Sequence, residues 1–552
     1  MAPTLDSLPN ETLALILGQF CAHCSKAHED DNFTDNFPDD HFRPANRRCG
    51  QQDEHEDPDE PLWYSRTYRN SLYSMCLVSK RLRPVAQSVL YHEFVPGYGD
   101  HRHRPEVSWG RRLSSFVRTI AARPDLAAVV KRAFVHCFLL RPVTEAEAQA
   151  TLSEVIGPGT HEYLAHFKDV QDWGRNPALQ LLGLLLALAP SLDRLSLQVD
   201  NYCLGIPAGA LSALGGLLQS RPLAKLKTLD VCDRSGYFSL EYHAKGILET
   251  VGSAFATLNL HMCSSTRVPL QKKLHNISTI RITHSQLRRD DLTLLFQSCA
   301  APSLKSFLYE TVNPLENMEY CIFSGSSRFS LRDPFPTKTV HTQLMFNLTV
   351  GGYDHDANHF QPSDAIRHLR LHKTTLESLH LDLRGIGRPG LRGAGDERPL
   401  SETLRDFPTL KHVFISTSML YNHHGKAPYA TDDSELLTAL LPPTITSLHL
   451  AGTLGTDTPR LARALLHLAR MAGAEFKTLR SVRCDVMAGY DGLLDDYEIE
   501  ETFAAIDVDF GYNTFPLSEP APDLGDRLPP RSEALWPVDW DSWCPSDGDD
   551  DL

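Results

Sequence analysis

Short apolar segments of the form L-x-x-L-x-L recur along this chain and constrain its fold more than any other feature. The copies are LDRLSL from Leu192, LKTLDV from Leu226, ISTIRI from Ile277, LESLHL from Leu376, LKHVFI from Leu410, ITSLHL from Ile445 and a degenerate LRSVRC from Leu479. Alternating apolar residues predict a short strand in each segment. Helical patterns lie between the strands, at 178–189, 210–220, 290–300 and 460–472. A strand and a helix repeated in this way predict an α/β array.

The spacing of these strands is irregular. Their central residues are separated by roughly 20 to 40 positions, and they are Leu195, Leu229, Leu258, Ile280, Phe307, Leu348, Leu379, Val413, Leu448 and Val482. The pattern resembles an irregular leucine-rich-repeat-like α/β solenoid over residues 108–510, in which each repeat packs its strand leucines and its helix against its neighbours. A general α/β domain with coincidental L-x-L strands is the alternative. A chain of 552 residues with 42% hydrophobic content is long enough for either fold.

A row of candidate binding residues follows from the solenoid interpretation. Side chains alternate between the two faces of a strand, so the residue between the two apolar positions of each segment points away from the core. The row is Ser196, Asp230, Asn259, Arg281, Leu308, His380, Phe414, His449 and Arg483. Mixed charged, imidazole and aromatic side chains suit a protein target. The predicted contacts are Arg281, His380, Phe414, His449 and Arg483. The alternative is a solvated strand face that binds nothing.

Two amphipathic segments near the amino terminus predict a small helical module. In the first, Leu13, Ile16, Leu17 and Phe20 lie at i, i+3, i+4 and i+7, the apolar stripe of a helix packed on one side. The second segment has a similar periodicity, and its apolar positions are Leu72, Met75, Cys76, Val78, Leu82, Val85 and Val89. Pro84 fits the first turn of a further helix. We therefore expect three short helices.

Short motifs in these segments resemble the F-box. They are Leu8-Pro9, Leu77-Val78-Ser79-Lys80-Arg81 and Leu90-Tyr91. The resemblance implies a surface that seats the Skp-type adaptor of a cullin-RING ubiquitin ligase, formed by Leu8, Pro9, Leu77, Val78, Lys80, Arg81, Leu90 and Tyr91. The sequence departs from the family in two places, because about fifty residues separate the first two helices and Leu82 replaces the common tryptophan. An ordinary small helical bundle is the alternative.

The net charge of −15 is concentrated in two segments. Residues 26–61 hold twelve acidic and four basic side chains, which gives −8, and residues 533–552 hold seven acidic side chains and no basic one. Since −8 and −7 sum to −15, the rest is formally neutral, which argues against a nucleic-acid partner. The expected organisation is an F-box-like helical module at 1–95 with a disordered acidic insert at about 25–66, a linker at 96–107, the solenoid at 108–510 and an acidic Pro- and Trp-containing tail at 511–552.

The sequence favours an intracellular protein without a membrane partner. The longest mainly apolar run, at 178–189, is about half the length of a transmembrane helix. The amino terminus lacks the pattern of a signal peptide. Twelve scattered cysteines fit a reducing compartment. The predicted location is the cytoplasm, the nucleus or both.

Motifs for chemistry are weak in this chain. The G-x-G-x-x-G at 385–390 continues into a proline-containing loop, whereas a dinucleotide site needs a helix there. Cys21 and Cys24 form a single C-x-x-C pair, half of a zinc motif, and the possible partners in the same insert are His28, His41, Cys49 and His55. A second C-x-x-C pair is missing from the sequence. We therefore expect no cofactor, no metal and no catalytic residue.

Together these features predict a non-enzymatic substrate-recognition subunit of a Skp-cullin-F-box type ubiquitin ligase. The helical module is expected to bind the adaptor, which connects the chain to the cullin-RING ligase. The repeats are expected to bind an unknown protein target. The alternative is a repeat-based scaffold that binds the adaptor without directing degradation.

Overall fold

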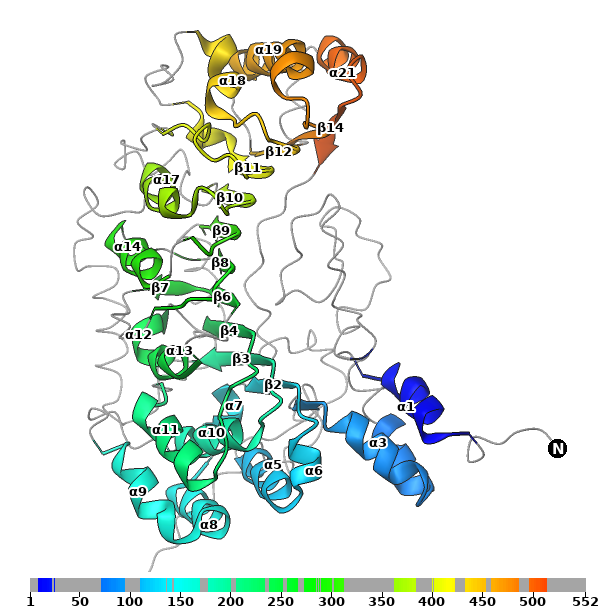
Figure 1. Ribbon diagram of the computed structural model, residues 1–552, viewed down its shortest axis with the longest axis vertical. Helices are drawn as coiled ribbons and strands as arrows, with labels where there is room; N and C mark the ends of the chain where they lie inside the picture. Colours follow the sequence, from blue (N-terminus) through cyan, green and yellow to red (C-terminus); the bar gives the residue numbers. More distant parts are fainter. Residues whose placement is uncertain are drawn as a thin grey trace, which may run out of the picture.

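The chain folds around one long parallel sheet (Figure 1). The computed structural model describes residues 8–21, 24, 71–94, 110–135, 137–140, 143–168, 177–199, 205–233, 238–251, 256–266, 273–283, 285, 287, 289–299, 302–311, 362–383, 400, 402–421, 432–452, 458–485 and 496–513. The expected acidic insert, the linker at 96–107, the glycine motif at 385–390 and the tail beyond residue 513 lie outside the described residues.

Twelve strands form this sheet, and each pairs in parallel with the next. In sheet order they are β1 (Glu93–Phe94), β2 (Arg132–Val135), β3 (Arg194–Val199), β4 (Thr228–Asp233), β6 (Thr257–His261), β8 (Thr279–Thr283), β9 (Ser306–Glu310), β10 (Ser378–Asp382), β11 (His412–Ser416), β12 (Ser447–Ala451), β13 (Ser481–Asp485) and β14 (Asp509–Asn513). A separate two-stranded sheet joins β5 (Phe238–Ser239) to β7 (Cys263–Ser265). The order follows the sequence, as expected for an array in which each unit contacts its neighbours.

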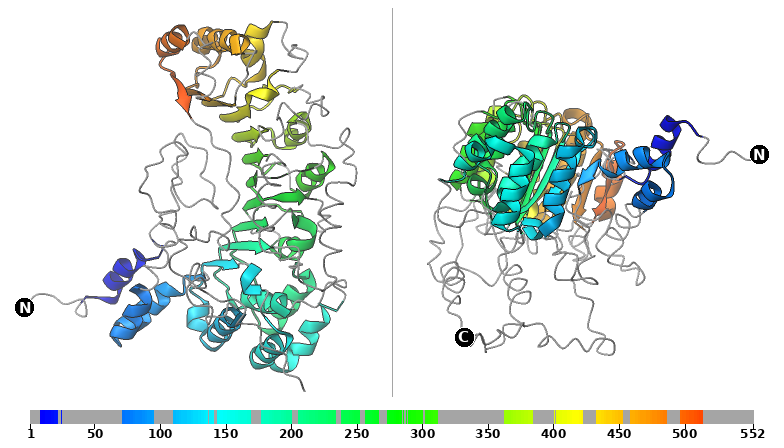
Figure 2. Two further views of the ribbon diagram at one scale, coloured as in Figure 1. Left: turned by 180° about the vertical axis from the view of Figure 1, so that it is seen from behind. Right: turned by 90° about the horizontal axis from the view of Figure 1, so that it is seen from below.

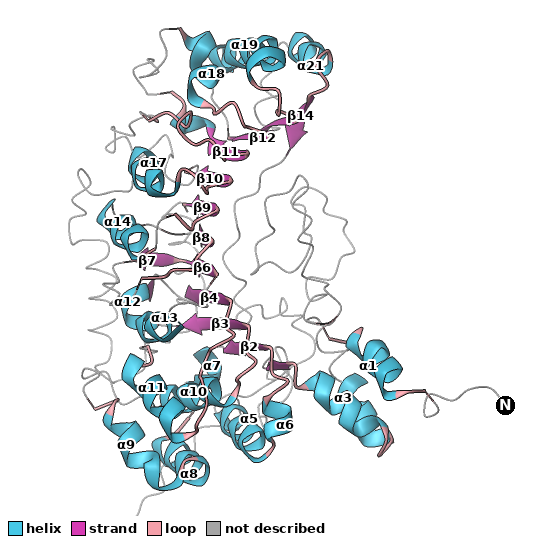
Figure 3. Ribbon diagram, in the orientation of Figure 1, coloured by secondary structure: helices cyan, strands magenta, loops and turns pink. Residues whose placement is uncertain are grey.

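Helices connect the strands and line one side of the sheet (Figure 3). They are α5 (Gly110–Ala122), α6 (Pro124–Ala127), α7 (Cys137–Leu140), α8 (Glu145–Val155), α9 (Thr160–Ala165), α10 (Pro177–Leu188), α11 (Ala208–Leu217), α12 (Leu240–His243), α13 (Lys245–Val251), α14 (Arg289–Ser298), α17 (Pro362–Leu369), α18 (Leu436–Leu440), α19 (Thr458–Glu475) and α21 (Asp496–Ala504). Short 3₁₀ turns are η2 (Gly157–Gly159), η3 (Arg370–His372), η5 (Thr417–Met419) and η6 (Asp433–Glu435). Their apolar faces and the strand leucines form one continuous core that extends from Phe94 to Val508.

A ladder of shared carbonyls holds the strands in register. The residue directly before a strand accepts hydrogen bonds from two consecutive amides of the next unit. The Glu377 carbonyl, for example, accepts from the amides of Lys411 at 2.8 Å and His412 at 3.0 Å. The carbonyls that accept in this way are those of His92, Lys131, Asp193, Lys227, Ala256, Ser278, Lys305, Glu377, Lys411 and Thr446. The same arrangement therefore runs from the first strand nearly to the last.

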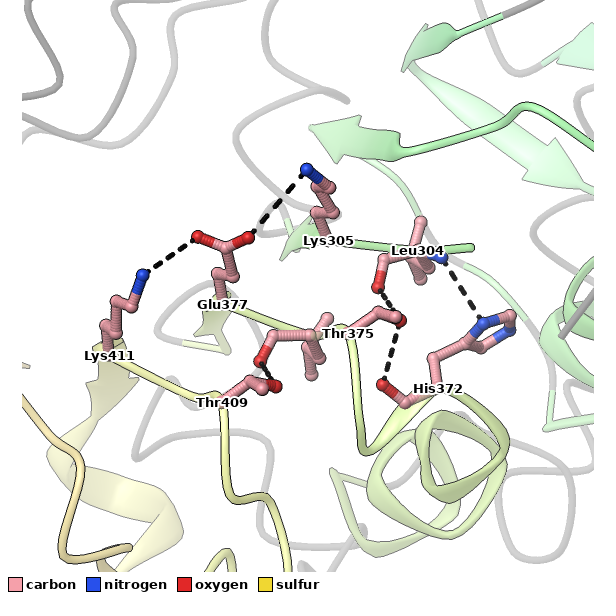
Figure 4. Close-up of polar contacts among 8 residues, drawn as sticks. Leu304, Lys305, His372, Thr375, Glu377, Thr409 and Lys411 are labelled. Atoms are coloured by element: carbon pink, nitrogen blue, oxygen red, sulfur yellow. Dashed lines mark hydrogen bonds and ion pairs between the residues drawn. The ribbon is translucent and has the colours of Figure 1, made fainter. Parts of the chain in front are cut away.

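A second ladder consists of threonines at the turns that precede four strands. The hydroxyl of Thr409 donates to the Leu376 carbonyl at 2.9 Å, one unit back along the array. Thr375, Thr444 and Thr478 make the equivalent bonds at 2.9 Å to the carbonyls of Leu304, Leu410 and Ile445. Figure 4 shows the part of this ladder around Thr375 and Thr409. Each bond satisfies a carbonyl that the strand ladder leaves open, so the turns of successive units are joined.

Three short helices at the amino terminus pack around a small core of their own. They are α1 (Asn10–Gly18), a helix at 71–78 and α3 (Leu82–Leu90), and together they are the helical module. The buried residues of this core are Leu17, Cys21, Leu72, Cys76, Ala86 and Val89. The helical module projects from the β1 end of the sheet (Figure 2).

The helical module is joined to the sheet by aromatic and backbone contacts. Phe116 of α5 stacks on Tyr91 at 5.6 Å and on Phe94 at 4.3 Å between ring centroids. The carbonyl of His92 accepts from the amides of Lys131 and Arg132 at 2.8 and 3.0 Å. His92 is therefore the first member of the carbonyl ladder, although it follows directly on the last helix of the module.

The structure corrects two expectations about the strands. Phe307 pairs directly with Leu379, so no strand lies between β9 and β10, where one was expected around Leu348. Leu348 itself lies outside the described residues. At the other end, β14 extends the sheet by one strand that the sequence pattern did not indicate. None of the helices in the described part of the chain is both long and apolar enough to cross a membrane.

Candidate docking surfaces

Exposed apolar side chains gather on the helical module. The described residues include eight large apolar side chains that are exposed to solvent, and five of these belong to α1 and the helix at 71–78. The five are Leu15 at 73%, Ile16 at 38%, Tyr73 at 57%, Leu77 at 62% and Val78 at 78% exposure, and we call them the apolar set. The other three, Tyr242, Leu371 and Tyr497, lie on three different elements of the sheet region. Several large exposed apolar side chains on one small module indicate a binding surface there.

The exposure follows from the shortness of the helices. On α1, Leu13 and Leu17 lie one turn apart and fill the buried face, which leaves Leu15 and Ile16 outside. The helix at 71–78 buries Leu72 and Cys76 in the same way. Tyr73 and Leu77 are also one turn apart, so they share its exposed face. Ile16 was expected on the packed stripe and this prediction is wrong, because the buried face of α1 is formed by Leu13 and Leu17 and does not extend to Ile16.

A hydrogen bond brings two of the F-box-like segments together. Nη2 of Arg81 donates to the Leu8 carbonyl at 2.5 Å, so Leu8-Pro9 and Lys80-Arg81 are neighbours although more than seventy residues separate them in sequence. Pro9, Lys80 and Arg81 are exposed and Leu8 is half-buried. The segment thus presents two cationic side chains beside exposed Leu77 and Val78.

The last F-box-like pair turns inward instead. Leu90 is half-buried and packs against the small core of the helical module. Tyr91 is half-buried and its ring stacks on Phe116. Of the eight residues predicted to bind an adaptor, these two therefore contribute to the internal packing, and the other six lie at the surface.

The predicted row of strand residues is present in register. Asn259 pairs with Arg281, Arg281 with Leu308 and Leu308 with His380. The series continues as Phe414, His449 and Arg483, and it begins as Ser196 and Asp230. The sequence therefore identified which residues share this face, and we call them the register row.

Most of the register row is buried. His380 and Phe414 stack with ring centroids 3.8 Å apart, and Phe414 retains only 3% of its exposure. Burial, with the nearby charges of Arg483 and His412, lowers the pKa of the His449 imidazole to about 4. Arg281 and Arg483 are half-buried, and Arg483 forms an ion pair with Asp509. The alternative of a solvated strand face therefore does not hold at His380, Phe414 and His449, which are buried, and a role of these residues in target binding stays a prediction.

A buried polar cluster lies at the β3–β6 end of the register row. The Asp230 carboxylate is fully buried and accepts from Arg194 Nε at 2.7 Å, Ser196 Oγ at 2.5 Å and Asn259 Nδ2 at 2.6 Å. Three donors, two from β3 and one from β6, compensate the cost of removing this charge from water. The three donors named here all belong to the sheet, so these bonds tie β3, β4 and β6 together.

An open hollow of about 410 Å³ lies along the turns that precede β9 to β13. It is lined by the threonine ladder and by charged residues that alternate in sign, in the order Lys305, Glu377 and Lys411 (Figure 4). Glu377 bridges Lys411 at 3.2 Å and Lys305 at 3.9 Å. This surface was not predicted, although three repeats carry its signal, a threonine before and a charged residue after their first apolar residue: Leu376, Leu410 and Leu479.

Two thiols and an imidazole meet at the base of the helical module. Sγ of Cys24 lies 3.1 Å from Nδ1 of His92, and Sγ of Cys21 lies 3.9 Å from the same nitrogen. The thiol pair was predicted from its spacing, whereas His92, which lies 68 residues beyond Cys24, was not. The partners that it considered, His28, His41, Cys49 and His55, lie outside the described residues.

Comparison with known proteins gives no match. A scan against models of protein families finds none that matches this chain, and a search of curated proteins finds no matching sequence. The possible functions of the chain are therefore inferred from the chemistry of three surfaces: the apolar set, the hollow and the thiol–imidazole cluster. The apolar set can bury itself against an apolar partner, the hollow can hydrogen-bond a polar one, and the thiol–imidazole cluster offers soft ligand atoms.

Proposed function

We propose that this chain is the substrate-recognition subunit of a Skp-cullin-F-box type ubiquitin ligase, with no catalytic role of its own. The helical module is the F-box, and it binds a Skp-type adaptor. One observation carries the proposal: Leu77 and Val78 of the F-box-like segments are exposed, and the rest of the apolar set lies on the same helix and on α1, which begins directly after Leu8-Pro9. Side chains such as Leu77 and Val78 are each stabilised by about 1.5–3 kcal/mol when a partner buries them fully.

The long sheet supports the second half of the proposal. We interpret it as a leucine-rich-repeat-like solenoid that presents a protein target. The hollow along the turns is the favoured contact surface, because it is open, whereas His380, Phe414 and His449 are buried. Its threonines and alternating charges suit a polar segment of a target. Tethering a target near the charged ubiquitin carrier raises the effective concentration of its lysines, and this requires no active site in the chain.

Adaptor binding tests the first half. The change is the double variant Leu77→Ala with Val78→Ala in the full chain, with affinity for a Skp-type adaptor measured by calorimetry. We expect binding to weaken by at least about tenfold, because two exposed anchors are removed. Leu371→Ala is the matched control, since Leu371 is also an exposed leucine but lies in η3 of the sheet region. The melting temperature should stay the same in both variants. If the unaltered chain does not bind the adaptor, the proposal fails.

Ubiquitination in a reconstituted ligase tests the second half. A protein that co-purifies with the chain is incubated with adaptor, cullin, RING subunit and charged carrier. We expect it to be ubiquitinated, and we expect modification to fall when Lys305 and Lys411 are both replaced by Ala. The alternative is a scaffold that binds the adaptor without directing degradation. A partner that binds in a hollow-dependent manner yet is never modified supports the scaffold.

A further inference from the structure

We propose that Cys21, Cys24 and His92 bind a zinc ion that fastens the helical module to the first strand of the sheet. The site departs from the sequence-based expectation of no metal, and it does not depend on the proposed ligase function. Two thiolates and one imidazole supply three ligands, and water completes the coordination. Binding displaces the two thiol protons to solvent, since zinc coordinates the thiolate form.

The geometry of the cluster matches the ion. The three ligand atoms all lie within 4.8 Å of one another. A tetrahedral site with Zn–S of about 2.3 Å and Zn–N of about 2.0–2.1 Å separates sulfur from nitrogen by about 3.5 Å. The two separations in the structure, 3.1 and 3.9 Å, lie on either side of this value. Small rotations of the two cysteine side chains therefore suffice to admit the ion.

The backbone arranges the two cysteines before any ion arrives. The amide of Cys21 donates to the Gly18 carbonyl, and the amide of Cys24 donates to the Cys21 carbonyl, both at 3.0 Å. These bonds form consecutive turns at the end of α1 that direct both thiols to one side. A Cβ atom at Gly18 would lie 3.3 Å from Cβ of Cys24, so the glycine permits this close return of the chain.

His92 is positioned just as firmly from the other side. Its amide donates to the Val89 carbonyl at 3.1 Å, which places it in the last turn after α3. Its carbonyl is the first member of the carbonyl ladder. A metal ion held by this imidazole therefore links two parts of the chain: the turn after α1, and the segment at His92 that joins the end of α3 to β1.

The chemistry of the donors selects zinc over harder ions. Sulfur and imidazole nitrogen are the common ligands of zinc, whereas magnesium and calcium prefer oxygen. Cys21 is buried, and Cys24 and His92 are half-buried, so the site is shielded on one side and open to entry on the other. An open side leaves room for the water ligand. An ion in this position would fix the angle between the helical module and the sheet.

Metal analysis of the full chain tests the proposal. The protein is purified under reducing conditions without chelator, and its zinc content is measured by mass spectrometry. We expect about one zinc ion per chain, and we expect this zinc to be lost in Cys24→Ser and in His92→Asn. Cys76→Ala is the matched control, because Cys76 is a buried thiol of the same helical module that lies outside the cluster. It should retain the zinc.

Cobalt substitution reports the ligands directly. In the unaltered chain, Co²⁺ should give intense visible bands typical of tetrahedral coordination and a thiolate charge-transfer band in the near ultraviolet. Cys24→Ser should lower the charge-transfer band, and His92→Asn should weaken the affinity by more than about tenfold. Chelator should lower the melting temperature of the helical module reversibly, which avoids reliance on variants that fail to fold.

Three results would overturn the proposal. One is zinc that remains in both Cys24→Ser and His92→Asn, which would mean an adventitious ion or another site. Another is the absence of both zinc and cobalt bands in the reduced chain. The third is a Cys21–Cys24 disulfide that persists under the reducing conditions. None of these outcomes would affect adaptor binding, so failure here is distinguishable from failure of the proposed function.

Discussion

The helical module and the sheet region differ in how completely they bury their apolar side chains. In the sheet, strand leucines and helix faces form one core that runs the length of the array, and the exposed large apolar side chains described there are scattered. The helical module buries a much smaller core and leaves the apolar set in solvent. Three short helices have too little interior for all of their apolar residues.

The difference bears on the proposed division of roles between the two regions. The sheet buries its apolar side chains against its own neighbouring strands and helices, so its stability is set within the chain. The helical module gains the most from association, because a partner would remove the apolar set from water. We therefore expect mutations in the sheet to change folding and mutations on the helical module to divide into two kinds, those of the small core and those of the docking face.

The largest expected effect comes from Asp230→Ala, which tests whether contacts within the sheet determine its stability. The variant leaves Arg194 without its buried carboxylate, and loss of one partner of a buried pair costs about 3–5 kcal/mol. Urea unfolding measures the change in the free energy of unfolding. Asp125→Ala is the control, because Asp125 pairs with Arg123 at the surface and its loss should have no measurable effect. Similar midpoints for both variants would contradict a structural role of the Asp230 cluster.

A Leu17→Ala variant tests whether the two regions unfold separately. Truncation of this fully buried side chain should destabilise the helical module by about 2–5 kcal/mol. Amide exchange should accelerate over 71–92 and remain slow in β10 to β13. Leu15→Ala is the control on the same helix, and it should leave exchange unchanged because Leu15 is exposed. Equal acceleration in both regions would show that they form a single cooperative unit.

Acid should weaken the sheet through His449. The folded-state pKa of about 4 lies below the unfolded value near 6.5, so the unfolded chain binds the extra proton first. The contribution of neutral His449 to the free energy of unfolding is therefore fully present above pH 6.5. It decreases as the pH falls towards 4, by up to about 3 kcal/mol. Melting temperatures from pH 7.5 to 4.5 measure the loss. His449→Gln should show a shallower decline, and an identical decline would exclude His449 as its origin.

The smallest effect is expected from the threonine ladder. Thr409→Ala removes the bond to the Leu376 carbonyl and should cost about 1 kcal/mol. Thr409→Ser keeps the hydroxyl and should recover most of that loss. Urea unfolding measures both variants. If Ser and Ala behave alike, the methyl packing of the threonine and not its hydrogen bond stabilises the turn.

Much of the sheet could be predicted from the spacing of apolar residues. Leu195, Leu229 and Leu258 were expected at the centres of strands, and the structure pairs them directly with one another. The helices at 178–189 and 460–472 were recognised for the same reason, since each is a long run with helical periodicity. Apolar spacing predicts these strands and helices correctly because every repeat buries the same positions of its strand and its helix.

Contacts between distant parts of the chain could not be predicted in this manner. The position of His92 beside Cys24 depends on how α1 and α3 pack, and no local pattern encodes that distance. Phe414 is likewise buried, with the ring of His380 stacked on it from the neighbouring strand, while alternation along a single strand predicts exposure. The exposed Ile16 shows the same limit of prediction from a local pattern. Helical periodicity indicates which side of a helix is apolar, but not how many residues on that side are buried.

The carbonyl ladder also bears on how such a chain can change. Each carbonyl of the ladder accepts hydrogen bonds from the next unit of the sheet. β9 and β10 are therefore neighbours despite the long stretch of sequence between Glu310 and Ser378. A connection can lengthen at one level without altering the register at any other. New surface can therefore be added beside an existing unit while the helices at the amino terminus keep their place. An architecture of this kind separates what is free to diversify from what must stay constant.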